Sequence, residues 1–220
     1  MKYLLTSGGV SNPTIHHALV QLLGKPISEC NALCIPTAVY PMKEGAQYAM
    51  EFLEGKSGAP MCELGWKQLG VLELTALPSL DQKIWISWLE NTDVILVNGG
   101  DPSFLAYWLR KSGVDQILPH LNAVYVGMSA GSMVMTPNIG HEFVEWVSKE
   151  GNDQPLGLVP FSIFPHLGHP MLPDNNIEAA NKWAKALRNE AYAMDDATAI
   201  EVVGPKISVL SEGKWVKFDF

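Results

Sequence analysis

The segment spanning residues 124–135 constrains the fold of this chain more than any other stretch. An apolar, β-rich run leads into residues 127–131, which spell Gly-Met-Ser-Ala-Gly, and the residues that follow can start a helix. This G-x-S-x-G pattern is typical of a nucleophile elbow, a sharp turn that exposes a serine hydroxyl at the carboxyl end of a strand. Small residues flank the serine because the strand and helix backbones pass close together. We therefore expect Ser129 to be a nucleophile; the alternative is an ordinary strand–turn–helix junction.

Apolar segments of strand type alternate with helical segments along the chain. The expected strands are residues 2–6, 31–36, 69–75, 93–97, the run before the elbow, 161–166, 191–203, 206–210 and 214–219. The expected helices begin at 13 and 101 and cover 43–55, 81–90, 113–121, 130–135 and 174–188, while 140–156 is polar and irregular. This alternation predicts an α/β fold with a mostly parallel sheet and helices on both faces. The 220 residues suffice for one domain, residues 1–220, and are too few for two.

Local signals predict helix starts and core positions. Asn12-Pro13 and Asp101-Pro102 each combine an N-cap residue with a proline at the first helical position. Two tryptophans of the 81–90 helix, Trp85 and Trp88, lie at a spacing that favours core packing. In the 174–188 helix, the periodicity predicts one apolar face, made of Ile177, Ala180, Ala184 and Leu187.

The charge balance argues against several classes of partner. The net charge is −8 and the pI is about 5.2, without a basic cluster, so we expect neither nucleic acid nor an anionic membrane as a partner. No apolar stretch approaches the ~20 residues of a membrane helix, and the N-terminus does not resemble a signal peptide. Three cysteines without a paired framework, Cys30, Cys34 and Cys62, indicate a reducing compartment. We expect a cytoplasmic protein, with Cys34 buried in a strand; the sequence does not specify an oligomeric state.

A serine nucleophile needs a base, which is usually a histidine held by a carboxylate. Among six histidines, His166 has the best placement, because it ends a predicted strand as Ser129 does. Reactive groups of such sheets collect beyond the carboxyl ends of the strands, here in the loops after residues 97, 128 and 164. We expect His166 to be the general base; the alternative is a loop histidine with a structural role. The spacing of His166 and His169 does not match H-E-x-x-H, so we expect no metal site and no cofactor.

Several carboxylates are candidates for the third member of the triad. Asp195 and Asp196 stand together at the end of a predicted strand, where acidic residues are unusual. Glu142 and Glu145 lie between the serine and the histidine, in a segment where carboxylates are usually solvated. We expect one of the two aspartates to face the site, and Glu142 and Glu145 remain alternatives.

An oxyanion hole requires fixed N–H donors beside the attacked carbonyl. The N–H of Ala130, directly after the nucleophile, is one candidate, and the Gly99-Gly100 pair after the strand at 93–97 supplies another. Glycine suits this position because the substrate approaches the backbone closely. Gly8-Gly9 after the first strand does not complete G-x-G-x-x-G and does not indicate a dinucleotide-binding fold.

Taken in order, these motifs resemble the peptidase E / cyanophycinase family of serine peptidases. The resemblance is carried by the elbow, by 98–101 (Asn-Gly-Gly-Asp), 164–166 (Phe-Pro-His) and 35–38 (Ile-Pro-Thr-Ala), and extends from Leu4 to about Ile200. It implies the class I glutamine amidotransferase-like fold and metal-independent peptide hydrolysis through an acyl-enzyme. It also implies Ser129 as nucleophile, His166 as base, and Gly100 and Ala130 as oxyanion donors. Amidotransferases of this fold carry cysteine at the elbow, so Ser129 disfavours glutamine hydrolysis.

Two positions depart from the family pattern. Peptidase E has an aspartate between the serine and the histidine, and the corresponding region of this chain offers Glu142 and Glu145 but no aspartate. Other members use an acid after the histidine, which matches Asp196, and on this ground we favour Asp196. Peptidase E also carries an arginine after the histidine that holds an amino-terminal aspartate of the substrate. This chain has only Arg110 and Arg188, and neither lies in 167–180. Lysine lacks the bidentate geometry of arginine.

We therefore expect a serine peptidase that hydrolyses small peptides, with dipeptides that begin with aspartate as one candidate substrate. One alternative is an amide or ester hydrolase of another specificity, including the cleavage of cyanophycin-like polymers. The other is a non-catalytic ligand-binding module that keeps the same fold.

Overall fold

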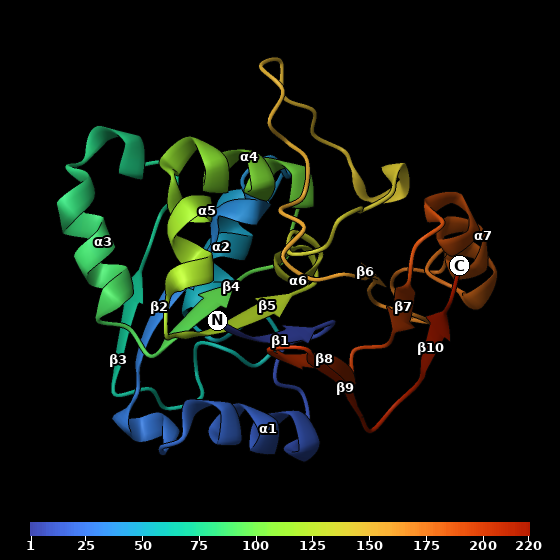
Figure 1. The fold of residues 1–220 in the computed structure, drawn as a ribbon, viewed down its shortest axis with the longest axis horizontal. Coiled ribbons are helices and arrows are strands. Elements are labelled where there is room, and N and C mark those ends of the chain that lie inside the picture. The colour runs from blue at the N-terminus through green and yellow to red at the C-terminus, as the bar shows by residue number, and fades with distance from the viewer.

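A seven-stranded sheet forms the centre of the computed structural model, which describes all 220 residues (Figure 1). Its strands, in spatial order, are β3 (Gln68–Val71), β2 (Asn31–Ile35), β4 (Val94–Val97), β5 (Val124–Met128), β1 (Lys2–Thr6), β8 (Thr198–Val203) and β9 (Lys206–Ser211). The strands from β3 to β1 pair in parallel, whereas β8 and β9 continue the sheet in antiparallel pairing. The prediction of an α/β fold with a mostly parallel sheet is confirmed.

Helices cover both faces of this sheet, because successive strand residues point to opposite sides. Leu4 of β1 belongs to a core formed with α1 (Pro13–Leu23) and α2 (Gly45–Leu53). Its neighbour Leu5 belongs to the opposite core, formed with α3 (Gln82–Glu90), α4 (Pro102–Ser112) and α5 (Val114–Ile117). Figure 1 shows α1 below the sheet, α4 and α5 above it and α3 at its upper left. No helix of the chain combines the length and the apolar character that crossing a membrane requires.

A second, three-stranded sheet lies beside the first and corrects the prediction of one strand over 191–203. It consists of β6 (Ser162–Phe164), β7 (Ala191–Met194) and β10 (Trp215–Phe218), covered by α7 (Ile177–Leu187). The chain leaves the small sheet after β7, turns at 195–197 and enters the large sheet as β8. Asp195 fixes this turn, because its carboxylate accepts hydrogen bonds from the Ala197 N–H and the Thr198 hydroxyl. The predicted strand is therefore two strands in different sheets.

Some side chains lie elsewhere than the periodicity predicts. Trp85 is 1% exposed as expected, but Trp88 is 43% exposed, because the buried stripe of α3 runs from Trp85 to Leu89. Helix α7 begins only after its N-cap Asn176, and Ile177 in its first turn is 47% exposed. The other elements agree with prediction within a few residues, although the helix expected over 113–121 is α5 followed by a 3-10 turn over 118–120, and that over 130–135 is the short helix α6 (Ala130–Met133).

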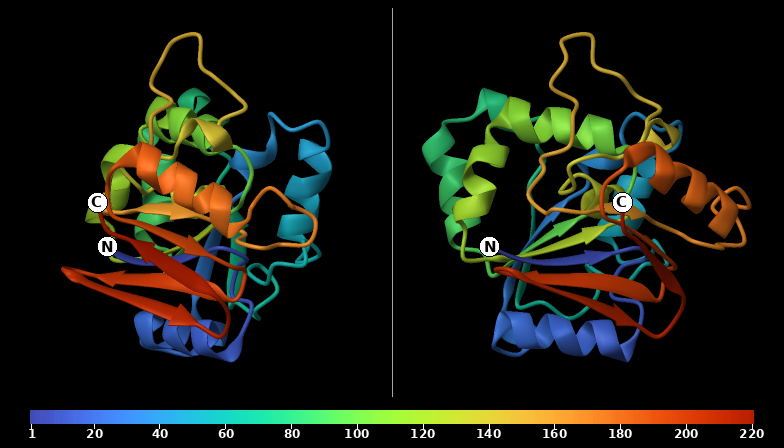
Figure 2. Two further views of the ribbon diagram at one scale, coloured as in Figure 1. Left: turned by 90° about the vertical axis from the view of Figure 1, so that its right-hand side faces the viewer. Right: turned by 45° about the vertical axis from the view of Figure 1, so that its right-hand side comes forward.

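The arrangement of strands brings several loops to one edge. The ends of β1 and β5 are paired at Thr6 and Met128, and Val97 at the end of β4 pairs with Gly127. Residues 144–160 contain no helix or strand and project from the body of the molecule (Figure 2). The loops after β1, β4, β5 and β6 therefore meet beneath the base of this projection, where the candidate site lies.

Candidate active site

The elbow places Ser129 between β5 and α6 in a conformation that side chains rarely adopt. Its φ is 49° and its ψ is −113°, and the strain of such backbone is typical of functional sites. The flanking glycines are required by close approach: a Cβ on Gly127 would lie 2.5 Å from the carbonyl oxygen of Gly131, and one on Gly131 would lie 2.5 Å from that of Val97. The turn therefore depends on the small residues that the sequence motif contains.

We expect Gly131→Ala to lower the free energy of unfolding by about 1–3 kcal/mol, because the added methyl group overpacks a rigid backbone contact. Urea denaturation measures the change. Gly70→Ala is the matched control, since its Cβ would meet only the end of the flexible Leu33 side chain, at 2.9 Å. Equal losses in the two variants would contradict the close-approach explanation.

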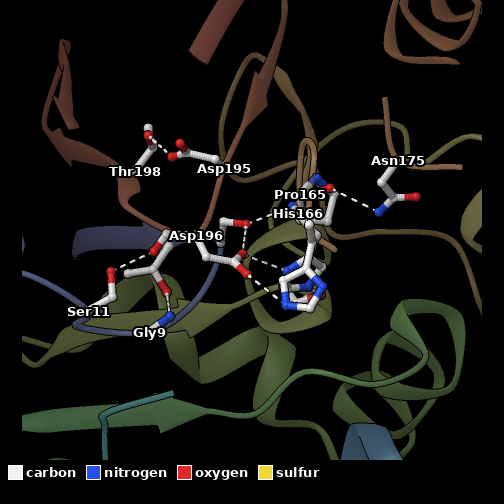
Figure 3. Close-up of polar contacts among 12 residues, drawn as sticks. Gly9, Ser11, Pro165, His166, Asn175, Asp195, Asp196 and Thr198 are labelled. Atoms are coloured by element: carbon white, nitrogen blue, oxygen red, sulfur yellow. Dashed lines mark hydrogen bonds and ion pairs between the residues drawn. The ribbon is translucent and has the colours of Figure 1, made fainter. Parts of the chain in front are cut away.

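Ser129, His166 and Asp196 form a continuous chain of hydrogen bonds. The hydroxyl of Ser129 lies 2.8 Å from Nε2 of His166. Nδ1 of the same ring lies 2.6 Å from Oδ1 of Asp196, and Figure 3 shows His166 beside Asp196. His166 itself has a left-handed backbone, with φ 58°. The order of these groups, hydroxyl to imidazole to carboxylate, is the order that activates a serine in hydrolases.

Asp196 reaches His166 because β8 runs antiparallel to β1. Thr6 at the end of β1 pairs with Ala199 at the start of β8, so the turn before β8 lies at the carboxyl edge of the parallel strands. Burial raises the pKa of Asp196, but hydrogen bonds from His166 and Ser7 and the charges of His166 and His169 outweigh it and lower the pKa overall. The carboxylate is therefore ionised at neutral pH, and the stability that its ionisation provides is lost only as the pH falls below the ordinary range of an aspartate.

The three alternative carboxylates do not contact His166. Asp195 points away from the site and holds the 195–197 turn and the Lys214 N–H. Glu142 and Glu145 line the cleft in front of Ser129, but neither has a hydrogen bond or an ion pair with His166. Asp196 is thus the carboxylate that the fold brings to the imidazole.

The predicted oxyanion donors flank the nucleophile. A Cβ on Gly99 would lie 3.3 Å from the Cβ of Ser129, so this glycine turn packs directly on the nucleophile. The N–H of Gly99 donates to Oδ1 of Asn98, whereas that of Gly100 has no partner within the chain. A Cβ on Gly100 would lie 2.3 Å from the carbonyl oxygen of Ala38, and its φ is 132°, so only glycine fits. Ala130 is the first residue of α6, where the N–H has no intrahelical acceptor.

A cleft of about 570 Å³ opens in front of Ser129, His166 and Gly100. Its lining contains four carboxylates and no lysine or arginine: Glu51, Asp101, Glu142 and Glu145. Arg110 lies elsewhere and binds the carbonyl groups of the 152–155 segment, and Arg188 is the C-cap of α7. The cleft therefore has a negative lining and contains no arginine that could hold a substrate carboxylate.

Asp101 does more in the structure than the predicted N-cap. One carboxylate oxygen accepts from the N–H of Phe104 and caps α4, while the other accepts from the N–H groups of Glu145 and Trp146. This second set of bonds fixes the irregular segment at the mouth of the cleft. The Asn-Gly-Gly-Asp sequence located the residue, but the segment that it binds is 44 residues away and no local pattern indicated it.

His169 lies beside the triad without joining a metal site. Its Nε2 is 3.7 Å from Oδ2 of Asp196, on the oxygen that His166 does not use. No group of three or more His, Cys, Asp or Glu side chains is arranged to hold a metal ion.

The chain is similar in sequence to several curated peptidases. An uncharacterized peptidase of Listeria monocytogenes is 29% identical over 126 residues, which cover 54% of this chain and 60% of the relative. Peptidase E of a Nostoc species is 32% identical over 97 residues, which cover 41% of this chain and 38% of the relative. The chain spans about half the length of the curated relatives it matches.

Solved structures show the same fold. The crystal structure of a peptidase from an acI-B1 actinobacterium superposes with a TM-score of 0.67 at 18% identity, covering 99% of this chain and 93% of that one. The sequence also matches the family model of Peptidase family S51 over residues 3–210, nearly the whole chain. The chain therefore belongs to peptidase family S51, a family of serine-type peptidases.

Proposed function

We propose that this protein is a serine peptidase that hydrolyses small peptides through an acyl-enzyme. The observation that carries the proposal is the unbroken chain of hydrogen bonds from Ser129 through His166 to Asp196 at the floor of the cleft. In the proposal Ser129 is the nucleophile, His166 the general base and Asp196 the group that orients and stabilises the imidazole. The left-handed backbone of Ser129 and His166, two residues that share a hydrogen bond, favours a catalytic site over a non-catalytic module.

Acylation follows from the order of the groups. Asp196 accepts the Nδ1–H of His166, which leaves Nε2 free to take the hydroxyl proton of Ser129 as Oγ attacks the scissile carbonyl. The carbonyl oxygen becomes an oxyanion, for which the N–H groups of Gly100 and Ala130 are the proposed donors. The imidazolium then gives its proton to the leaving amine, the C–N bond breaks, and the acyl group stays on Ser129.

Deacylation repeats the sequence with water. His166 takes a proton from a water molecule that enters as the amine leaves, and the resulting nucleophile attacks the ester carbon. When the tetrahedral intermediate collapses, Ser129 recovers its proton from His166 and the acid product departs. The reaction consumes one water and requires no redox partner.

The charge of the cleft bears on which peptides are substrates. A peptide that begins with aspartate would bring a second negative charge toward Glu51, Glu142 and Glu145, and no cation of the lining would offset it. Two like charges a few ångströms apart in a partly solvated cleft repel by about 1 kcal/mol or more. The proposed substrates are therefore small peptides with a neutral or basic amino-terminal residue, and an aspartyl dipeptide is disfavoured.

We expect dipeptides that begin with alanine or lysine to have a kcat/KM about tenfold above that of the matched Asp-X peptide, as a repulsion of this size implies. The three kcat/KM values are measured by following the release of free amino groups from Ala-X, Lys-X and Asp-X dipeptides that have the same residue X. Raising the salt concentration should narrow the difference, since screening weakens the repulsion. Preferred cleavage of Asp-X would contradict the charge argument, and cleavage of none of the peptides would favour an amide or ester substrate of another kind.

A further inference from the structure

Ser7, which the sequence motifs left without a role, lies at the junction of the base and its carboxylate. It directly follows β1, and its side chain is completely buried. Its Oγ lies 2.7 Å from Oδ1 of Asp196 and 2.7 Å from the backbone nitrogen of His166. One hydroxyl therefore joins two residues that are 30 positions apart in the chain.

The chemistry of these two contacts fixes the direction of the Ser7 proton. The backbone N–H of His166 can only donate, so Oγ of Ser7 is the acceptor in that bond. The hydroxyl proton is then available to Asp196, whose ionised carboxylate can only accept. Oδ1 of Asp196 thus accepts two hydrogen bonds, one from the Ser7 hydroxyl and one from Nδ1 of His166. This arrangement favours the tautomer of His166 that leaves Nε2 unprotonated and facing Ser129.

The backbone of His166 needs such a partner. Its φ of 58° is a left-handed conformation that costs a residue other than glycine about 1–2 kcal/mol. The Ser7 hydroxyl accepts a hydrogen bond from the N–H of His166 and donates to Oδ1 of Asp196, the same oxygen that the imidazole contacts. Ser7 therefore links the main chain of His166 to the carboxylate that orients its ring.

Gly8 brings the end of β1 close enough for this contact. A Cβ at Gly8 would lie 2.6 Å from the Cβ of Asp196, so the strand end and the 195–197 turn are in direct contact. The Ser7-Gly8 pair after β1 is therefore explained by its contact with Asp196, the third member of the proposed triad. No nucleotide-binding role is needed to account for it.

We propose that Ser7 is a positioning residue of the active site, which holds the main chain of His166 and directs Oδ1 of Asp196 toward the imidazole. The inference rests on the proposed function. Ser7 does not line the cleft, so it acts through His166 and Asp196 and not on the substrate. Burial raises the pKa of Asp196, and the contacts of His166 lower it. The hydrogen bond from Ser7 makes a smaller contribution in the same direction as His166.

The test compares Ser7→Ala with Ser11→Ala. Ser11 is the matched control, because its hydroxyl also bonds Asp196, at 2.5 Å, but on the main-chain carbonyl and in an exposed position (Figure 3). A fluorophosphonate reports two quantities, the rate of labelling at the nucleophile and the final fraction labelled. Steady-state peptide hydrolysis supplies kcat and KM for the same proteins.

We expect Ser7→Ala to be labelled to completion, but about 10- to 100-fold more slowly than the wild type, by analogy with the residues that orient metal-binding side chains in metalloenzymes. Its kcat should fall by a similar factor with KM unchanged, and Ser11→Ala should match the wild type. A labelling rate equal to that of the wild type would overturn the inference. An unchanged rate with a smaller labelled fraction would also overturn it, because that result indicates a merely structural role for Ser7. A wild type that is not labelled at all would instead overturn the proposed function, and this inference with it.

Discussion

Ser129→Ala is expected to lower kcat by about 10⁵- to 10⁶-fold, the loss seen when a protease loses its serine nucleophile. The hydroxyl lies 2.8 Å from Nε2 of His166, and no other serine hydroxyl forms a hydrogen bond with this ring. Peptide hydrolysis under saturating substrate measures the loss. The variant should fold as the wild type does, since the hydroxyl makes no hydrogen bond except that to His166.

Ser132→Ala is the matched control for this result. Ser132 lies three residues further along, is completely buried and donates to the carbonyl oxygen of Thr6. Its loss should reduce stability by about 1 kcal/mol, as for a buried hydrogen bond, and leave kcat within a few-fold of the wild type. Substantial activity in Ser129→Ala would contradict the assignment of the nucleophile.

The second large effect is expected for Asp196→Asn, about 10⁴-fold in kcat, as in a protease whose triad aspartate was replaced in this way. The neutral amide removes the charge that stabilises the imidazolium, and its NH₂ group competes for the position that accepts the proton of Nδ1. His166 is then free to turn the wrong nitrogen toward Ser129. The loss should appear in kcat and much less in KM, because Asp196 does not line the cleft.

Asp195→Asn separates this effect from damage to the turn. Asp195 precedes Asp196, carries the same side chain and holds the turn through Thr198, 2.8 Å away. We expect this variant to lose stability and to keep kcat within a few-fold of the wild type. A loss of activity at Asp195 equal to that at Asp196 would show that the turn, and not the charge on His166, is what matters.

The features of the fold that agree with the prediction are those with local causes. The elbow is visible in the sequence because the close approach of strand and helix requires glycine at 127 and 131, whatever the rest of the chain does. The N-caps Asn12 and Asp101 are equally local, since each side chain bonds an N–H three residues away. The mostly parallel sheet follows from the alternation of apolar strands with helices.

The remaining features depend on contacts between distant segments. Residues 191–203 form one β-rich run that is interrupted by Asp195-Asp196, and no local pattern shows that the chain passes from one sheet to the other at the 195–197 turn. That passage makes β8 antiparallel to β1 and brings Asp196 beside His166 and Ser7. The prediction that Trp88 packs in the core was wrong for a related reason, because its exposure depends on how much of α3 the sheet covers.

The most direct test of the account is to identify the residue that a fluorophosphonate modifies in the wild type, by mass spectrometry of the digested protein. We expect one phosphonyl group per chain, on the peptide that contains Ser129, and much slower labelling in His166→Ala and Asp196→Asn. No adduct under conditions that label other serine hydrolases, or an adduct on a different serine, would contradict it.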